Sequence, residues 1–205
     1  MARPRSDIRL RIVHAARGVF AAQGVDGAAL RAIARAARTN IGMIYYYFPS
    51  KDDLFLAVVE EHYERLLADV AAVLARPGSF EDHLRGLYDR IGALDGEELE
   101  VMRLVLREAL SSQTRFRRLI DRALRGHIPL VMQLVLEGLA AGKLDAGRHP
   151  VMLLVATMAL AALPQLALRT LPLPGAPAQA ERAGQLVDIL LHGIAARPPG
   201  GSRSL

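Results

Sequence analysis

A run of side chains between residues 38 and 51 has the types and spacing needed to contact nucleic acid. Arg38, Asn40 and Lys51 offer hydrogen-bond donors, and three consecutive tyrosines occupy positions 45–47. Arginine, lysine and tyrosine side chains bind phosphates, whereas amide and small apolar side chains contact base edges. Successive residues of a helix point in different directions, so we expect one tyrosine to face inward and two to face outward. The alternative is an aromatic helix end packed into a core.

Catalytic chemistry has no comparable signal. The chain has no cysteine, which excludes disulfides, thiolate metal sites and cysteine nucleophiles. The six histidines are scattered without metal-ligand spacing. No Gly-x-Ser-x-Gly motif and no phosphate-binding glycine loop is present. We therefore expect no enzyme, no metal site and no cofactor.

Positive charge is concentrated in the first quarter of the chain. Residues 1–51 hold nine Lys or Arg and two acids, whereas residues 52–205 hold 17 bases and 19 acids. Such a distribution is typical of a polyanion-binding segment attached to a near-neutral body. A solvated arginine-rich helix surface would give the same count.

Hydrophobic periodicity predicts the elements that position these side chains. Helices are expected at about 6–23, 28–36 and 41–47, with a tight break at 37–40. Ser6 is the expected N-cap of the first helix, and Gly24 its end. Two short helices joined by a tight break allow the second to enter a DNA major groove while the first crosses the backbone.

The segment 8–60 resembles the N-terminal DNA-binding domain of TetR-type (tetracycline-repressor family) transcriptional regulators. The resemblance lies in these residues: Ile12, Ala16, Phe20, Gly24, Leu30, Ile33, Ala34, Gly42, Ile44, Tyr45, Tyr47, Phe48, Pro49, Lys51 and Leu54. It implies a helix-turn-helix head and a homodimeric repressor with a ligand pocket in the C-terminal body. It also implies these DNA-contact positions: Arg31, Arg38, Asn40, Ile41, Gly42, Met43, Tyr45, Tyr46, Tyr47 and Lys51.

The sequence departs from the family pattern in three places, at 28–29, at 38–39 and at 40. Ala28 and Ala29 stand where a hydroxyl residue usually caps the second helix, so Asp26 or Gly27 is expected to cap it instead. Arg38 replaces the usual turn glycine, and Thr39 replaces an apolar residue. Asn40 replaces the usual Ser or Thr and caps equally well.

The remaining chain predicts an all-α body. Helices are expected at about 51–75, 80–93, 97–112, 114–141, 150–168 and 178–196, with Ser79 and Asp82 forming a capping box and Pro129 kinking the fourth. The segment 150–168 is long and apolar enough to resemble a membrane span, but Pro164 and Gln165 interrupt it and it is rich in alanine. We interpret it as a core or interface helix.

The body is expected to hold a ligand pocket and a dimer interface. The expected ligand contacts are Met102, Arg103, Leu106, Met132, Gln133, Met152 and Met158, with Gln165 among further polar candidates. The expected dimer contacts, on helices 150–168 and 178–196, are Val155, Ala159, Ala162, Leu186, Val187, Leu190 and Ile194. Ordinary packing within one chain is the alternative for both sets.

The sequence therefore predicts an all-α cytoplasmic regulator with a DNA-binding domain at 1–51, a ligand-binding and dimerisation domain at 52–197 and a disordered tail at 198–205. Its expected partners are operator DNA, a hydrophobic small molecule and a second copy of itself, and not a membrane. The alternative is a helical dimeric interaction module that has lost specific DNA binding. A membrane-associated helical protein is a further alternative, which solubility without detergent would distinguish.

Overall fold

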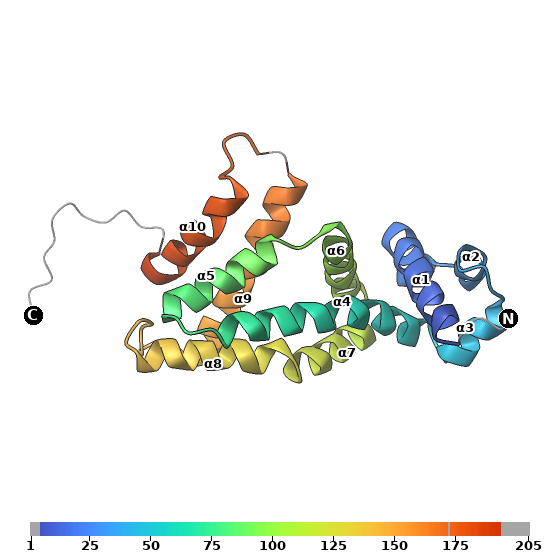
Figure 1. The fold of residues 1–205 in the computed structure, drawn as a ribbon, viewed down its shortest axis with the longest axis horizontal. Coiled ribbons are helices and arrows are strands. Elements are labelled where there is room, and N and C mark those ends of the chain that lie inside the picture. Colours follow the sequence, from blue (N-terminus) through green and yellow to red (C-terminus); the bar gives the residue numbers. More distant parts are fainter. Residues whose placement is uncertain (1–4, 172, 194–205) are drawn as a thin grey trace, which may run out of the picture. The chain divides into compact units, whose positions relative to one another are not determined.

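A computed structural model describes residues 5–171 and 173–193, and this part of the chain is helical without strands (Figure 1). The all-α prediction is confirmed. The helices are α1 (Arg5–Gly27), α2 (Leu30–Ala36), α3 (Ile41–Tyr47), α4 (Lys51–Leu74), α5 (Phe80–Gly92), α6 (Gly96–Ser111), α7 (Gln113–Leu124), α8 (His127–Ala140), α9 (Pro150–Thr170) and α10 (Gln179–His192).

The chain packs as two compact units. Unit 1 comprises residues 1–71 and 94–129, and unit 2 comprises residues 72–93 and 130–205. Unit 1 therefore joins the three N-terminal helices to most of α4 and to α6 and α7. The expected domain boundary at residue 51 falls inside this unit.

Unit 1 is held by one apolar core. Ile12 and Phe20 of α1, Ile33 of α2, Ile44 of α3 and Phe55 of α4 are almost completely buried in it. Each such side chain contributes about 1.5–3 kcal/mol when it leaves water. The core thus fixes the orientation of α3, whose seven residues could not form a stable helix alone.

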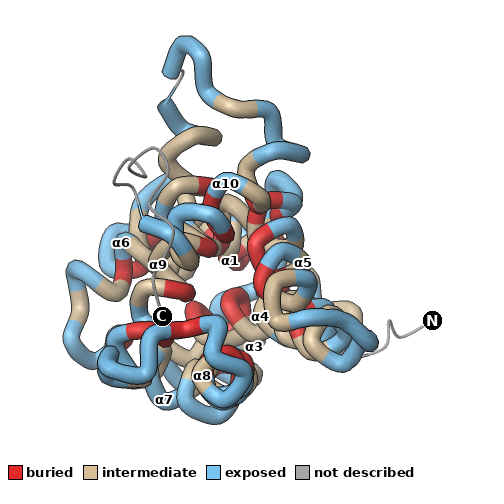
Figure 2. Tube along the Cα trace, turned by 90° about the vertical axis from the view of Figure 1, so that its left-hand side faces the viewer, coloured by how far each residue is buried: buried red, intermediate tan, exposed pale blue. Residues whose placement is uncertain are grey.

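Unit 2 is built around α5, α9 and α10, which pack against one another. Ser79 and Asp82 form the predicted capping box at the start of α5. The buried face of α5 includes Leu84, Leu87 and Tyr88, and Figure 2 shows buried positions alternating with exposed ones along this helix. The described part of unit 2 therefore has its own core.

Two helix ends differ from their predictions. The first helix begins at Arg5, so Ser6 is not its N-cap. Gly24 has φ 77° and interrupts α1 without ending the run, because one further helical turn follows it. No side chain caps α2, whose N-cap is Ala29; the expectation for Asp26 or Gly27 was wrong because the Asp26 carboxylate pairs with Arg115 instead.

The predicted helix 114–141 is in fact two helices, and the break lies before the proline. A Cβ on Gly126 would lie 2.1 Å from the Tyr63 hydroxyl, so only glycine fits against that ring. The same hydroxyl accepts the backbone N–H of His127 at 3.0 Å. Pro129 then lies in the first turn of α8, where its missing N–H has no helical acceptor to lose.

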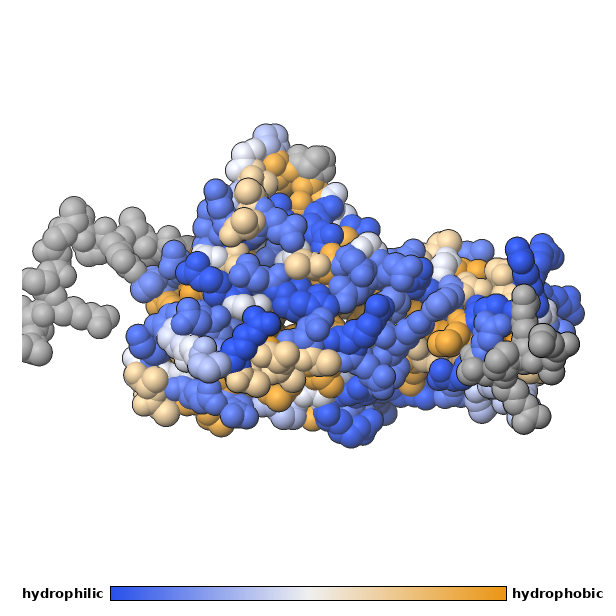
Figure 3. All heavy atoms as spheres, in the orientation of Figure 1, coloured by the Kyte–Doolittle hydropathy of each residue, from blue (hydrophilic) through white to orange (hydrophobic). Residues whose placement is uncertain are grey.

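Helix α9 continues through Pro164, as the predicted range 150–168 requires, and ends at Thr170. By length and composition it could cross a membrane, and 28% of its most apolar stretch is buried. Apolar side chains also lie at the surface along the lower edge of Figure 3, where α8 runs. Ile194 and the predicted tail at 198–205 lie outside the described residues.

Candidate functional site

The turn between α2 and α3 has the geometry of a compact helix-turn-helix. The N–H of Thr39 returns to the carbonyl of Ala34 at 3.0 Å, which closes the end of α2. Arg38 has φ 52° and is the one non-glycine residue with positive φ in the described part of the chain. The turn therefore keeps the left-handed conformation that glycine would adopt easily, although arginine occupies it.

Asn40 starts α3 as predicted. Its side-chain oxygen accepts the N–H of Met43 at 3.0 Å, which satisfies one of the free donors of the first turn. A Cβ on Gly42 would lie 3.1 Å from the same Asn40 oxygen. Glycine at this position therefore leaves room for the cap.

The outer face of α3 is a short row of large, solvent-exposed side chains. Ile44 is buried below, whereas Ile41, Tyr45 and Tyr46 are 37%, 54% and 66% exposed. Tyr47 is half-buried and packs against the core of unit 1, with its ring edge-on to Tyr46. This is the expected division of two outward tyrosines and one inward.

Basic side chains lie beside this row. Arg31 on α2 and Arg38 in the turn are exposed, and within the described residues neither guanidinium has an ion-pair partner. Lys51, at the start of α4, donates from Nζ to the carbonyl of Asp26 at 3.0 Å. A phosphate contact by Lys51 would therefore replace or share this bond.

Helices α6 and α7 brace the turn at residues 24–29 through a buried ion pair. Glu108 and Arg115, about 3% and 4% exposed, lie 2.9 Å apart. Glu108 also accepts the N–H of Val25 at 3.1 Å. Arg115 donates to Asp26 at 2.6 Å and to Asp52 at 3.0 Å. The last turn of α1 and the start of α4 are thus tied to one guanidinium.

The charges of this cluster support one another. The hydrogen bond from Arg115 lowers the pKa of Asp26 below its ordinary value, although burial opposes the shift. The same bond raises the pKa of Arg115, whose contacts with Asp52 and Glu108 add to the effect. Asp26 and Arg115 therefore each favour the ionised form of the other.

Two further arginines connect α1 to α6. Arg17 pairs with Glu97 and with Glu100, the latter at 3.3 Å, and Arg107 donates to the carbonyls of Phe20 and Ala21. Sequence reasoning missed these contacts and the Glu108–Arg115 pair. The signal that could have indicated them is the unusual density of arginine and glutamate on segments that also carry an apolar face.

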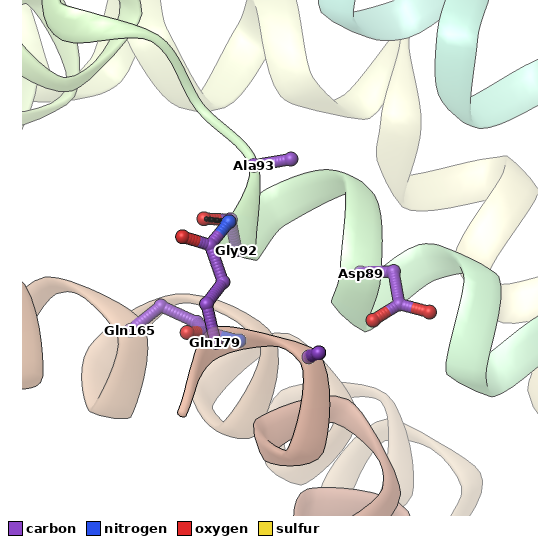
Figure 4. Close-up of a pocket in the computed structure, with 6 residues that line it drawn as sticks. Asp89, Gly92, Ala93, Gln165 and Gln179 are labelled. Atoms are coloured by element: carbon purple, nitrogen blue, oxygen red, sulfur yellow. Dashed lines mark hydrogen bonds between the residues drawn. The ribbon is translucent and has the colours of Figure 1, made fainter. Parts of the chain in front are cut away.

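Unit 2 contains a cavity of about 380 Å³ among α5, α9 and α10. Its lining residues are Asp89, Gly92, Ala93, Gln165, Gln179 and Ala180. Figure 4 shows Gln179 reaching from α10 to the carbonyl of Gly92, to which its Nε2 donates at 2.8 Å. Burial raises the pKa of Asp89, and Arg85 opposes that shift.

The expected ligand contacts do not line this cavity, apart from the further candidate Gln165. Met102, Arg103 and Leu106 lie on α6 in unit 1, whereas the other four lie on α8 and α9 in unit 2. Gln133 is exposed and donates to Glu137 at 2.9 Å, and Met152 is 62% exposed.

The expected dimer contacts differ in how far they are exposed to solvent. Val155 is half exposed on α9, Ala159 and Ala162 are partly buried on the same helix, and Leu190 is partly buried on α10. Leu186 and Val187 are buried within this chain. A further row of exposed apolar side chains on α9, which the prediction did not include, contains Val151, Met152 and Leu163.

Comparison with known proteins gives a family match for the N-terminal segment. Residues 12–58 match the family described as "Bacterial regulatory proteins, tetR family". The HTH-type transcriptional regulator SrpR of Pseudomonas putida is 28% identical over 160 residues, which are 69% of this chain and 75% of SrpR. The HTH-type transcriptional repressor SCO4008 of Streptomyces coelicolor is 32% identical over 113 residues, and the match spans only about half of either chain, 55%.

The fold is also found among solved structures. The transcriptional regulator FadR from Bacillus subtilis, in complex with stearoyl-CoA, superposes with a TM-score of 0.75. The match covers 91% of this chain and 99% of FadR at 19% identity. The likeness therefore extends beyond the N-terminal helices to the arrangement of the following ones.

Proposed function

Because the chain belongs to the TetR family of transcriptional regulators, we propose that it is a homodimeric repressor that binds a pseudo-palindromic operator and leaves it when a small, largely apolar effector binds. The observation that carries this proposal is α3. It is capped by Asn40, anchored by buried Ile44 and presents Tyr45 and Tyr46 to solvent. A major groove about 12 Å wide admits such a helix.

The residues on and around α3 take distinct roles in this proposal. Asn40, Ile41 and Met43 lie at its start, where a groove helix meets base edges. Tyr45 and Tyr46 contact bases or the sugar–phosphate backbone. Three basic side chains and one tyrosine contact phosphates, which fix the register of the protein on DNA: Arg31, Arg38, Tyr47 and Lys51.

We propose that a second copy of the chain covers the exposed face of α9. Val151, Val155 and Leu163 are each about half exposed on this helix, and exposed apolar surface of this kind marks protein interfaces. A two-fold dimer would present two α3 helices to half-sites roughly 34–36 Å apart. The helix's membrane-like composition then reflects burial between two copies, and the protein acts in the cytoplasm.

An effector acts in this proposal by favouring the spacing that does not fit DNA. A ligand with equal affinity for both spacings would leave DNA binding unchanged. FadR from Bacillus subtilis, which has the same fold, was solved with stearoyl-CoA, and this supports an effector with an apolar body. The body's helices, linked to the head by α4, are the route for the change.

The experiment is selection of duplexes from a random library, followed by fluorescence anisotropy with the selected duplex and a scrambled one. We expect the selected duplex to bind at least about tenfold more tightly, equivalent to 1.4 kcal/mol, and both affinities to fall steeply with salt. Equal affinity for the two duplexes would reject the operator proposal. It would favour a helical dimeric module without specific DNA binding.

A further inference from the structure

Within the described residues, one polar group that lines the cavity among α5, α9 and α10 lacks a hydrogen-bond partner. Gln165 on α9 is 3% exposed, and within the described residues its buried Oε1 has no hydrogen-bond partner. Leaving a buried acceptor unpaired costs free energy, so native proteins rarely retain one without a reason. A hydrogen-bond donor on a bound molecule would remove this cost.

The Gln165 amide lies against the end of α5, and both line the cavity. Gly92, at the end of α5, has no side chain, and a Cβ there would lie 2.8 Å from the Gln165 amide nitrogen. Figure 4 shows the Gln165 side chain directed from α9 toward Gly92 and Gln179. The amide of Gln179 already donates to the Gly92 carbonyl, so it does not satisfy the Gln165 oxygen.

The charges of the residues that line the cavity indicate what kind of hydrogen-bond donor a ligand would carry. Asp89 lines the cavity one helical turn before Gly92 and is exposed to solvent. Arg85 favours the ionised form of this carboxyl but is not one of the lining residues. The lining residues thus include one anion and no cation, and the remaining wall is formed by small side chains such as Ala93 and Ala180.

We propose that this cavity binds a small organic ammonium ion, with an N–H donating to Gln165, the positive charge near Asp89 and an apolar body along the alanines. A volume of about 380 Å³ lies within the range of small-molecule sites. This inference deepens the proposed effector response by naming the ligand class. It is tested without DNA, so either proposal can fail without the other.

The experiment is isothermal titration calorimetry of the full chain with three probes of similar shape. Phenethylammonium carries the cation, 2-phenylethanol is the neutral analogue and 3-phenylpropionate is the anion. We expect saturable binding of phenethylammonium at least about tenfold tighter than that of either analogue, because charge-assisted hydrogen bonds are stronger than neutral ones.

Three variants assign the effect to the cavity. Asp89→Asn should weaken phenethylammonium about fivefold or more while leaving the alcohol unchanged, because it removes only the charge. Gln165→Met keeps the length of the side chain and should abolish the preference for the cation. Asp188→Asn removes an exposed carboxylate of α10 outside the cavity and serves as the matched control, with unchanged binding.

Thermal unfolding of Gln165→Met separates ligand binding from a structural role. An unpaired acceptor contributes nothing to stability, so the variant should unfold at the same temperature as the parent or higher. A large fall in its unfolding temperature would overturn the proposal. So would absence of saturable binding, which is also expected if a second copy of the chain fills the cavity, and so would equal affinities for the three probes.

Discussion

Replacing Arg38 by glycine should stabilise the turn and weaken DNA binding at the same time. Arg38 has φ 52°, and a left-handed conformation costs a non-glycine residue about 1–2 kcal/mol. Glycine removes this strain but adds about 0.5–1 kcal/mol of backbone entropy to the unfolded chain. The net change therefore ranges from about zero to 1.5 kcal/mol in favour of the folded state.

These magnitudes define the expected melting shift. One kcal/mol moves the midpoint by about 2–4 °C in a protein of this size, so Arg38→Gly should melt between zero and about 6 °C higher. The matched control is Arg38→Ala, which loses the guanidinium but keeps the strained backbone. It should not gain stability.

The same two variants separate charge from strain on DNA. If each Arg38 contributes about 1 kcal/mol through a phosphate contact, each loss weakens binding about fivefold, or about 25-fold for a dimer. The salt slope should fall by about two per dimer, since each phosphate contact contributes about 0.9. Fluorescence anisotropy measured against salt concentration gives both the affinity and the salt slope. Both should fall by the same amount in Arg38→Gly and in Arg38→Ala.

Either measurement can refute the reasoning. Unchanged affinity and slope in both variants would show that Arg38 is a tolerated surface residue. A lower melting temperature for glycine than for alanine would show that the turn stores no strain that glycine relieves.

The other predictions concern the head, the interface and acidity. Lys51→Ala should weaken selected and scrambled duplexes alike and lower the salt slope by about one per subunit, measured by anisotropy; a change in sequence preference would contradict its phosphate assignment. Val155→Asp should yield monomers or aggregate in sedimentation, because it places an unpaired charge in the proposed interface, whereas Leu136→Asp, a similarly exposed position on α8, should remain dimeric. Burial lowers the pKa of His127 below the unfolded value, so the unfolded state binds the proton more readily and stability should decline as pH falls below about 6.5, measured by urea unfolding. His127→Asn should reduce this slope, and an unchanged slope would exclude His127 as its source.

Local signals predicted the head of the molecule well. The range 41–47 and the Asn40 cap follow from capping chemistry and helical periodicity, which depend on neighbours a few residues away. The same holds for the Ser79–Asp82 capping box. These features could be predicted because the interacting atoms are close in the sequence.

Features that depend on distant contacts could not be predicted from the sequence. The helix break at Gly126 depends on the ring of Tyr63, more than 60 residues earlier, whereas Pro129 gave a misleading local signal. The cavity depends on how α5, α9 and α10 meet. Of its lining residues, only Gln165 stood out in the sequence, because glutamine is unusual within so apolar a segment.

The Glu108–Arg115 pair limits how this protein can be recombined with its relatives. A chimera cut at residue 51 would carry Val25 and Asp26 into a foreign body that need not supply the acceptor and guanidinium they bind here. Leaving the buried N–H of Val25 without its acceptor costs about 1–3 kcal/mol, enough to weaken a transplanted head. A graft that also exchanges α6 and α7 would keep these contacts, so the transferable piece is discontinuous in the sequence.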